Sequence, residues 1–207
     1  MRASDFIIHN ILMLIGDERM KTLNKVVFGL MVYVFASGGL GFLIAGFIDV
    51  VPLVGGCILF AKCMISLGIT IYVYKKDNEG DTLKNVSMVC LMIVYVGMIF
   101  LTKVDAAYAF GFVVLCVYVL FFDVKLITIT GISMIILNAI SVVVRLVNNK
   151  MHSGKPIDGR FIFVQCVCVC AFVVIIIIVT HLSKKFNDEK IRKIEIFFST
   201  FLTCLIS

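Results

Sequence analysis

Six apolar stretches, each long enough or almost long enough to cross a membrane as a helix, constrain this 207-residue chain more than any other feature. They span residues 26–47, 51–74, 86–101, 106–122, 126–147 and 161–182. The hydrocarbon core of a bilayer is about 30 Å thick, which requires about 20 apolar residues in a helix. The stretches are too long for soluble strands and lack the alternation of a transmembrane barrel. They therefore predict an all-α fold, a polytopic membrane helix bundle with about six transmembrane helices.

Composition excludes several classes of protein. Hydrophobic residues make up 61% of the chain and charged residues 15%, whereas soluble domains have about 45–50% and about 25%. An ordinary soluble enzyme, a disordered protein and a nucleic-acid module are thereby excluded. The partner that remains is the lipid bilayer, and no nucleic acid is expected.

The stretches divide the chain into three parts. Residues 1–25 form an N-terminal cytoplasmic or interfacial segment, 26–182 the transmembrane domain, and 183–207 a C-terminal cytoplasmic exit helix. The apolar stretch 6–15 lacks the flanks and cleavage site of a signal peptide. It predicts a short helix on the cytoplasmic membrane surface, with a disordered tail as the alternative.

The distribution of lysine and arginine predicts that both termini are cytoplasmic. With that orientation, thirteen basic residues lie inside and five outside, since Lys62 lies within a helix and the chain has 19 in all. The outer set consists of Lys103, Arg145, Lys150, Lys155 and Arg160.

Lys62 lies near the middle of the second stretch, in CILFAKCMISLG. A lysine at the centre of a bilayer costs about 2.5–3.5 kcal/mol on insertion scales, so it should face protein or water. One interpretation is a ligand or counter-ion position. The other is a tolerated lysine whose amine reaches toward the interface.

No motif indicates catalysis, a metal or a cofactor. The chain has no nucleophile elbow, phosphate-binding loop or paired carboxylates, so it is not expected to be an enzyme. The alternating Cys166, Cys168 and Cys170 do not share one helical face, and we interpret them as small apolar residues of a helix.

Aromatic residues at the start of the fourth stretch suggest a shallow external pocket. Tyr108 lies at its outer end and Tyr118 deeper along it. Both are candidate ligand-binding residues together with Lys62, although interfacial aromatics are common in any membrane protein.

Small residues predict close packing of the first two helices. Ser37, Gly41 and Ala45 have small-xxx-small spacing, and Gly55 and Gly56 open the second stretch. Such residues let helix backbones approach closely in lipid.

The sixth helix is predicted to continue unbroken from about 161 past Lys185 toward Glu195. Neither glycine nor proline occurs between Arg160 and Ser207, and the weak helix formers present cost far less than the roughly 3 kcal/mol of a proline. Ile191 and Ile194 share one helical face. The alternative is a break near 186–188, with 191–207 folded back onto the membrane.

Several segments resemble a known sensor family. These are AYAFGFVVLCVYVLFFDVKLITITGISMIILNAISVVVRLV at 107–147, with its turn FDVKLI at 122–127, LNKVV at 23–27, and SKKFNDEKIRKIE at 183–195. Together they resemble the six-helix membrane sensor region of bacterial methyl-accepting chemotaxis proteins, and similar regions precede diguanylate cyclase domains. The turn contains Asp123 and Lys125. Asp123 is also expected to cap the following helix, because an aspartate at a helix start accepts hydrogen bonds from its free N–H groups.

The resemblance implies a non-enzymatic sensory input module in a bacterial inner membrane, forming a homo-oligomer. A signal would pass through the sixth helix to a cytoplasmic output domain, which this chain, ending at Ser207, does not include. The candidate relay residues are Asp123, Lys125, Lys184, Lys185, Ile191 and Ile194. The alternative function is a small membrane transporter or accessory protein; Lys62, Asn138 and Gln165 are the clear polar candidates along a path.

Overall fold

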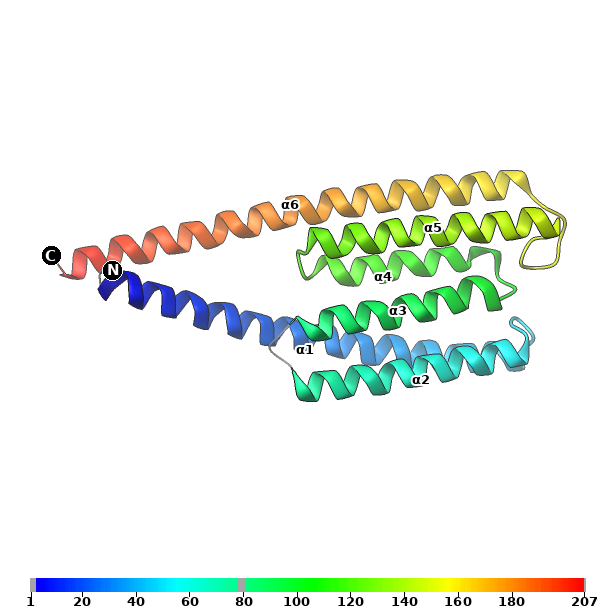
Figure 1. The fold of residues 1–207 in the computed structure, drawn as a ribbon, viewed down its shortest axis with the longest axis horizontal. Coiled ribbons are helices and arrows are strands. Elements are labelled where there is room, and N and C mark those ends of the chain that lie inside the picture. The colour runs from blue at the N-terminus through cyan, green and yellow to red at the C-terminus, as the bar shows by residue number, and fades with distance from the viewer. Residues whose placement is uncertain (1–2, 78–80, 207) are drawn as a thin grey trace.

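The structure is a computed structural model that describes the backbone of residues 3–77 and 81–206. Side chains are described from residue 21 onward, apart from 78–80, 195, 198, 199 and 201–207. The described chain is helical, and its helices form one elongated bundle (Figure 1). This confirms the predicted all-α helix bundle.

Six α-helices and one 3₁₀ helix follow each other along the described chain. They are α1 (Ala3–Phe47), α2 (Leu53–Lys76), α3 (Thr82–Leu101), η1 (Asp105–Ala109), α4 (Phe110–Val119), α5 (Val124–Asn148) and α6 (Gly159–Ile206). Five of them, α1, α2, α3, α5 and α6, contain segments that are long and apolar enough to cross a membrane. The molecule is therefore suited to a multi-pass position in the bilayer.

The bundle has two distinct ends. Both α1 and α6 extend past the rest of the bundle at the same end, which we call the terminal end (Figure 1). The end of α2, the start of α3 and the connection at 120–123 lie there, whereas the connections at 48–52, 102–104 and 149–158 lie at the other, distal end.

The fourth apolar helical segment is shorter than the predicted 106–122, and it is not among the five that are long enough to cross a membrane. η1 and α4 together cover Asp105–Val119, about 25 Å at about 2.0 Å per residue for the first and about 1.5 Å for the second. The helix ends because the backbone of Phe122 is left-handed, with φ 52°. This turn brings the chain directly to Asp123, which begins α5.

Two helices begin earlier in the chain than predicted. The third starts at Thr82 and not at 86, so the loop predicted at 75–85 is only five residues long, 77–81. The stretch 6–15 does not form a separate surface helix, since it belongs to the single 45-residue helix α1. Charged residues at 17–21 separate the two apolar stretches in sequence, but every one of them is compatible with a helix.

The predicted continuity of the sixth helix is confirmed. α6 has 48 residues without a break through 186–188, and spans about 70 Å at about 1.5 Å per residue. That is more than twice the hydrocarbon thickness. The alternative of a folded-back C-terminal segment is wrong for the described residues.

The core lies where α3 meets α4, α5 and the middle of α1. Its largest fully buried side chains include Phe35, Tyr95, Tyr118 and Met134. α6 closes one side with Val173 and Ile176, and the ring of Phe172 stacks on that of Phe112 at 4.2 Å between centroids. Apolar side chains such as those of Val147 and Phe163 remain exposed on the outside of the bundle, as a lipid-facing surface requires.

The first two helices pack closely, but through other small residues than predicted on α1. A Cβ added to Gly56 would lie 2.7 Å from the carbonyl oxygen of Phe42 and 3.2 Å from the Cα of Gly46. Gly39 similarly faces Cys63. By contrast, Ser37 and Gly41 are exposed, because the α1 contact face is offset by about two residues from the predicted one.

Replacing Gly56 with alanine is expected to lower the free energy of unfolding by about 1–3 kcal/mol, the usual cost of overpacking. Both obstructing groups are backbone atoms, so α1 and α2 must separate. Thermal unfolding in detergent micelles measures the loss. Gly41→Ala is the matched control: nothing lies within 4 Å of its Cβ position, so stability should stay equal or rise. Equal loss in both variants would contradict close packing at Gly56.

Candidate functional site

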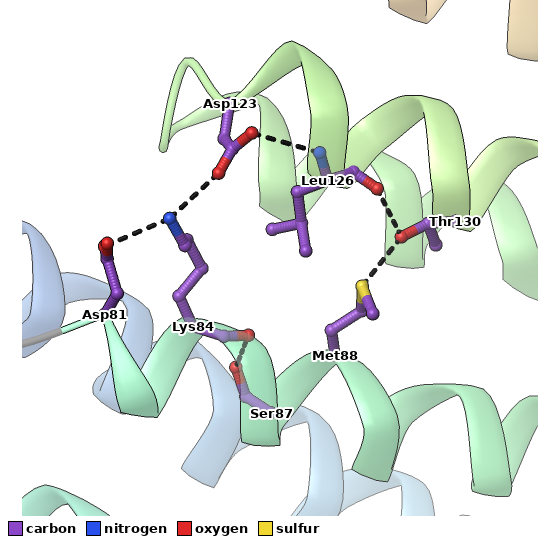
Figure 2. Close-up of polar contacts among 7 residues, drawn as sticks. All are labelled: Asp81, Lys84, Ser87, Met88, Asp123, Leu126 and Thr130. Carbon is purple, nitrogen blue, oxygen red and sulfur yellow. Dashed lines mark hydrogen bonds and ion pairs between the residues drawn. The ribbon is translucent and has the colours of Figure 1, made fainter.

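Asp123 connects two helices at the terminal end of the bundle. Its Oδ1 accepts a hydrogen bond from the backbone N–H of Leu126 at 3.0 Å, which confirms the predicted cap of α5. Its Oδ2 accepts from Nζ of Lys84 on α3 at 2.9 Å, as Figure 2 shows. One carboxylate thus fixes the start of α5 and ties it to the start of α3.

Lys84 is the centre of this terminal contact. Its amine also lies 3.0 Å from Asp81 and 5.9 Å from the centroid of the Phe121 ring (Figure 2 draws Asp81). The lysine side chain is only 10% exposed, against 31% for Asp123. Burial alone would raise the pKa of the Asp123 carboxyl, but the hydrogen bond and charge of Lys84 together with the backbone N–H groups of Leu126 and Lys125 outweigh burial and lower that pKa.

A second set of polar contacts lies on the neighbouring turns. Ser87 donates to the carbonyl oxygen of Lys84, and Thr130 donates to that of Leu126 and contacts the sulfur of Met88 at 2.9 Å (Figure 2). α3 and α5 are therefore joined over more than one turn at this end.

The other candidate relay residues lie apart from Asp123. The backbone N–H of Lys125 donates to the Asp123 carboxylate. Among the residues that the structure describes, however, no hydrogen bond or ion pair joins Asp123 to the side chains of Lys125, Lys184 or Lys185, and the Lys125 side chain is exposed. A surface hollow of about 550 Å³ separates α6 from the start of α5. It is lined by Val124, His181, Lys184, Lys185, Asp188, Glu189 and Arg192. Farther along α6, Ile191 is half-buried and Ile194 exposed.

A chain of buried polar side chains crosses the distal half of the bundle. Asn138 of α5 donates to the hydroxyl of Tyr95 on α3 at 2.6 Å, and its Oδ1 accepts from Nε2 of Gln165 on α6 at 3.1 Å. Oε1 of Gln165 accepts from Nη2 of Arg145 at 2.6 Å. All four side chains are buried, so this distal polar chain connects α3, α5 and α6 where water is excluded.

The distal loop 149–158 lies against this chain. Oγ of Ser141 on α5 is 3.1 Å from Nε2 of His152, and the backbone N–H of Ser153 donates to Oδ1 of Asp105 at 3.2 Å. Burial lowers the pKa of His152, and the positive charge of Arg145 lowers it further, while Asp105 acts in the opposite direction. The loop, η1 and α5 therefore meet around one group of charges.

The two tyrosines do not form one external pocket. Tyr108 lies at the distal end, where its ring is edge-on to those of Phe112 and Phe161 and its carbonyl accepts from Tyr95. Tyr118 is fully buried near the opposite end, with its hydroxyl 3.4 Å from Oγ of Ser87. The prediction that Tyr118 lines an external pocket is wrong, because ten residues of helix carry it to the opposite end of the bundle.

Lys62 is half-buried and lines an open groove of about 390 Å³ on the outside of the bundle. Its amine lies against Gly97, where an added Cβ would be 3.2 Å away, and Met88, Met92 and Leu137 lie along the groove. Among the residues that the structure describes, none forms an ion pair with this lysine.

Replacing Lys62 with leucine is expected to leave the free energy of unfolding unchanged or to raise it, because an unpaired amine in an apolar groove costs energy. Unfolding in detergent measures the change. Lys76→Leu, at the terminal end of α2, is the control. Marked destabilisation by Lys62→Leu alone would show that the amine has a stabilising partner.

Sequence reasoning misplaced Arg145. The distribution of basic residues assigns Arg145 to the outer side, but its side chain lies in the last turn of α5 and is 2% exposed. The available signal was spacing. Ser141 and Arg145 follow Asn138 by three and seven residues, which places all three on one face of an otherwise apolar helix. Gln165 was noted as polar, but its partners lie 20 and 27 residues earlier in the chain.

The chain was also compared with protein-family models, curated proteins and solved structures. None of them matches. Within the described part of the chain, His, Cys, Asp and Glu side chains form no group of three or more that could hold a metal ion.

Proposed function

We propose that this protein is a non-enzymatic sensory input module of a bacterial membrane receptor, of the kind found in chemotaxis receptors. A change at the distal end passes to the cytoplasm through α6. One observation carries the proposal: Gln165, a member of the distal polar chain, lies on a helix that continues unbroken to Ile206 beyond the terminal end.

Gln165 couples the position of α6 to the position of α5. Its amide bonds to both Asn138 and Arg145, and inside a membrane a broken hydrogen bond of this kind cannot be replaced by water. A shift of Arg145 must therefore either move α6 or leave polar groups unsatisfied. Because a continuous helix is stiff, a displacement at Gln165 reaches the far end of α6.

The terminal end is built to let α6 move relative to the other helices. Lys84 and Asp123 hold α3 and α5 together there, whereas an open hollow separates α6 from Val124. The polar side chains around the hollow can rearrange in water when α6 is displaced. The relay is thus the part of α6 at the terminal end, where Lys184 and Lys185 lie beside the hollow.

The orientation follows from charge. Because Arg145 is buried within the bundle, the basic residues counted at the distal end fall from five to four, against thirteen at the terminal end. The excess favours a cytoplasmic terminal end. Both termini are then cytoplasmic, and α6 delivers its movement to an output domain there in a homo-oligomer.

A fusion of the full chain to a diguanylate cyclase tests this function. The cyclase follows Ser207 in continuous helical register, and membrane-bound cyclase activity is measured at equal protein amounts. Gln165→Leu is expected to change activity roughly fivefold or more, the size of a coupling free energy near 1 kcal/mol. The control Val167→Leu, an exposed residue two positions along, should match the wild type.

An active fusion whose output is the same in all three forms would contradict the sensory function. Saturable solute uptake by proteoliposomes of the chain, lost in Gln165→Leu, would instead favour the transporter.

A further inference from the structure

Two buried donors at the distal end have no acceptor. Arg145 is 2% exposed, and its Nη2 and Nε donate to Gln165 and to the carbonyl oxygen of Ser141, but Nη1 has no partner. The hydroxyl of Ser153 is likewise buried and unpaired, although its backbone N–H is bonded to Asp105. Each such group costs about 1–3 kcal/mol, and a charged one more.

Both donors belong to the same region. Ser141 lies one helical turn before Arg145 and contacts His152, the residue that precedes Ser153, at 3.1 Å. The charge of Arg145 also acts on the His152 ring. The loop 149–158 therefore lies against the part of α5 that carries the guanidinium.

The chain itself does not supply the missing acceptor. Among the described residues, none forms an ion pair with Arg145 within 4.0 Å. Asp105 contributes a favourable charge from a greater distance, but its Oδ1 already accepts from Ser153. One negative charge with two acceptor atoms would satisfy both donors.

We propose that the distal end binds a small carboxylate beneath the loop 149–158, with one oxygen accepting from Nη1 of Arg145 and the other from the hydroxyl of Ser153. A carboxylate matches the planar donors of a guanidinium. A dianion such as phosphate is disfavoured, because Asp105 is nearby and the site is buried. The proposal rests on the proposed function, since it makes this site the input that moves Gln165.

The loop must open for the ligand to enter. It is short and closed by a bridge between Lys150 and Pro156 and by the backbone hydrogen bonds that the N–H groups of Met151 and Gly154 donate within the loop, with Gly154 at φ 79° in its turn. Two polar contacts, from His152 to Ser141 and from the N–H of Ser153 to Asp105, tie the loop to the bundle, so opening has to break these two bonds. A carboxylate bound to Nη1 would then change the charge balance beside the bond from Nη2 to Gln165.

Binding is tested on the full chain in phosphatidylcholine nanodiscs. Thermal unfolding is followed by circular dichroism during titration with sodium acetate or glycine, with sodium chloride and sodium phosphate at matched ionic strength as reference salts. We expect a saturable rise in Tm with a carboxylate and none with chloride or phosphate. Arg145→Gln should abolish the rise, and Ser153→Ala should weaken apparent affinity about tenfold, the value of a hydrogen bond to a charged group.

Lys155→Gln, which removes an exposed positive charge from the same loop, should bind like the wild type. Ser153→Ala keeps the test decisive even where Arg145→Gln does not fold, because it removes only an unpaired hydroxyl. The proposal is overturned if neither acetate nor glycine saturates, if chloride gives the same rise, or if Ser153→Ala binds as tightly as the wild type. Acetate binding without any change in cyclase output would instead overturn the sensory function and leave the site intact.

Discussion

Replacing Asp123 with alanine is expected to lower the free energy of unfolding by about 2–3 kcal/mol, through loss of a helix cap and of the partner of a buried lysine. Lys84 would keep only Asp81, whose side chain is 66% exposed. The loss is smaller than for a fully buried pair because Asp123 itself is 31% exposed. Denaturant unfolding in micelles measures it.

Asp123→Asn separates the two contributions. The amide oxygen can still accept from Leu126, so this variant should lose only the charge interaction, about 1–2 kcal/mol. The folded pKa of Asp123 is lowered, so its stabilisation is present above the unfolded pKa of about 3.9 and is lost as the pH falls through the folded pKa. Asp123→Asn should therefore lose less stability than the wild type below about pH 4. Identical acid sensitivity would contradict the pairing.

Gln165→Leu is expected to lower the free energy of unfolding by about 2–4 kcal/mol, because it leaves two buried groups without their partners. These are Nη2 of Arg145 and Oδ1 of Asn138. The leucine has similar volume, so packing changes little. Thermal unfolding in nanodiscs measures the effect.

The control is Val167→Leu, because the Val167 side chain is exposed on the outside of the bundle. This substitution should change the free energy of unfolding by less than about 0.5 kcal/mol. If Gln165→Leu is as stable as this control, the distal polar chain does not hold α6 to α5.

Periodicity and hydrophobic length predicted the helices but not all of their ends. Each apolar stretch coincides with a helix of the structure, since backbone groups in lipid must bond within the helix. The starts of α1 and α3 lie earlier in the chain than predicted. Charged residues such as Lys84 are compatible with a helix, so they do not by themselves show where a helix begins. In α3 the lysine is buried by a residue 39 positions later, Asp123.

The distal polar chain was beyond what sequence alone could establish. Asn138 and Gln165 stood out as polar residues in apolar stretches, but their partners come from separate helices whose relative rotation the sequence does not define. Arg145 was misplaced for the same reason: at the end of a helix, a basic residue is equally compatible with water and with the bundle interior. By contrast, the Asp123 cap depends on local geometry and was predicted.

The continuity of α6 was predictable because it is local. No glycine or proline interrupts it, and no tertiary contact is needed to keep it helical. What the sequence could not show is that this helix shares buried hydrogen bonds with α5 at one end and passes an open hollow at the other. From that combination we infer that a displacement of α6 carries the signal.

Pulsed electron spin resonance distances between labels at Lys125 and Lys193, on a cysteine-free background in nanodiscs, test this claim most directly. A second pair at His181 and Lys193 monitors the helix itself and should give about 18 Å in every variant, at about 1.5 Å per residue. Gln165→Leu should shift the Lys125–Lys193 distance by about 2 Å, the scale of helix shifts in signalling proteins, whereas Val167→Leu should not. A Lys125–Lys193 distribution that is the same in all three proteins, or a short and broad His181–Lys193 distribution, would contradict the claim that α6 carries a signal from the distal end.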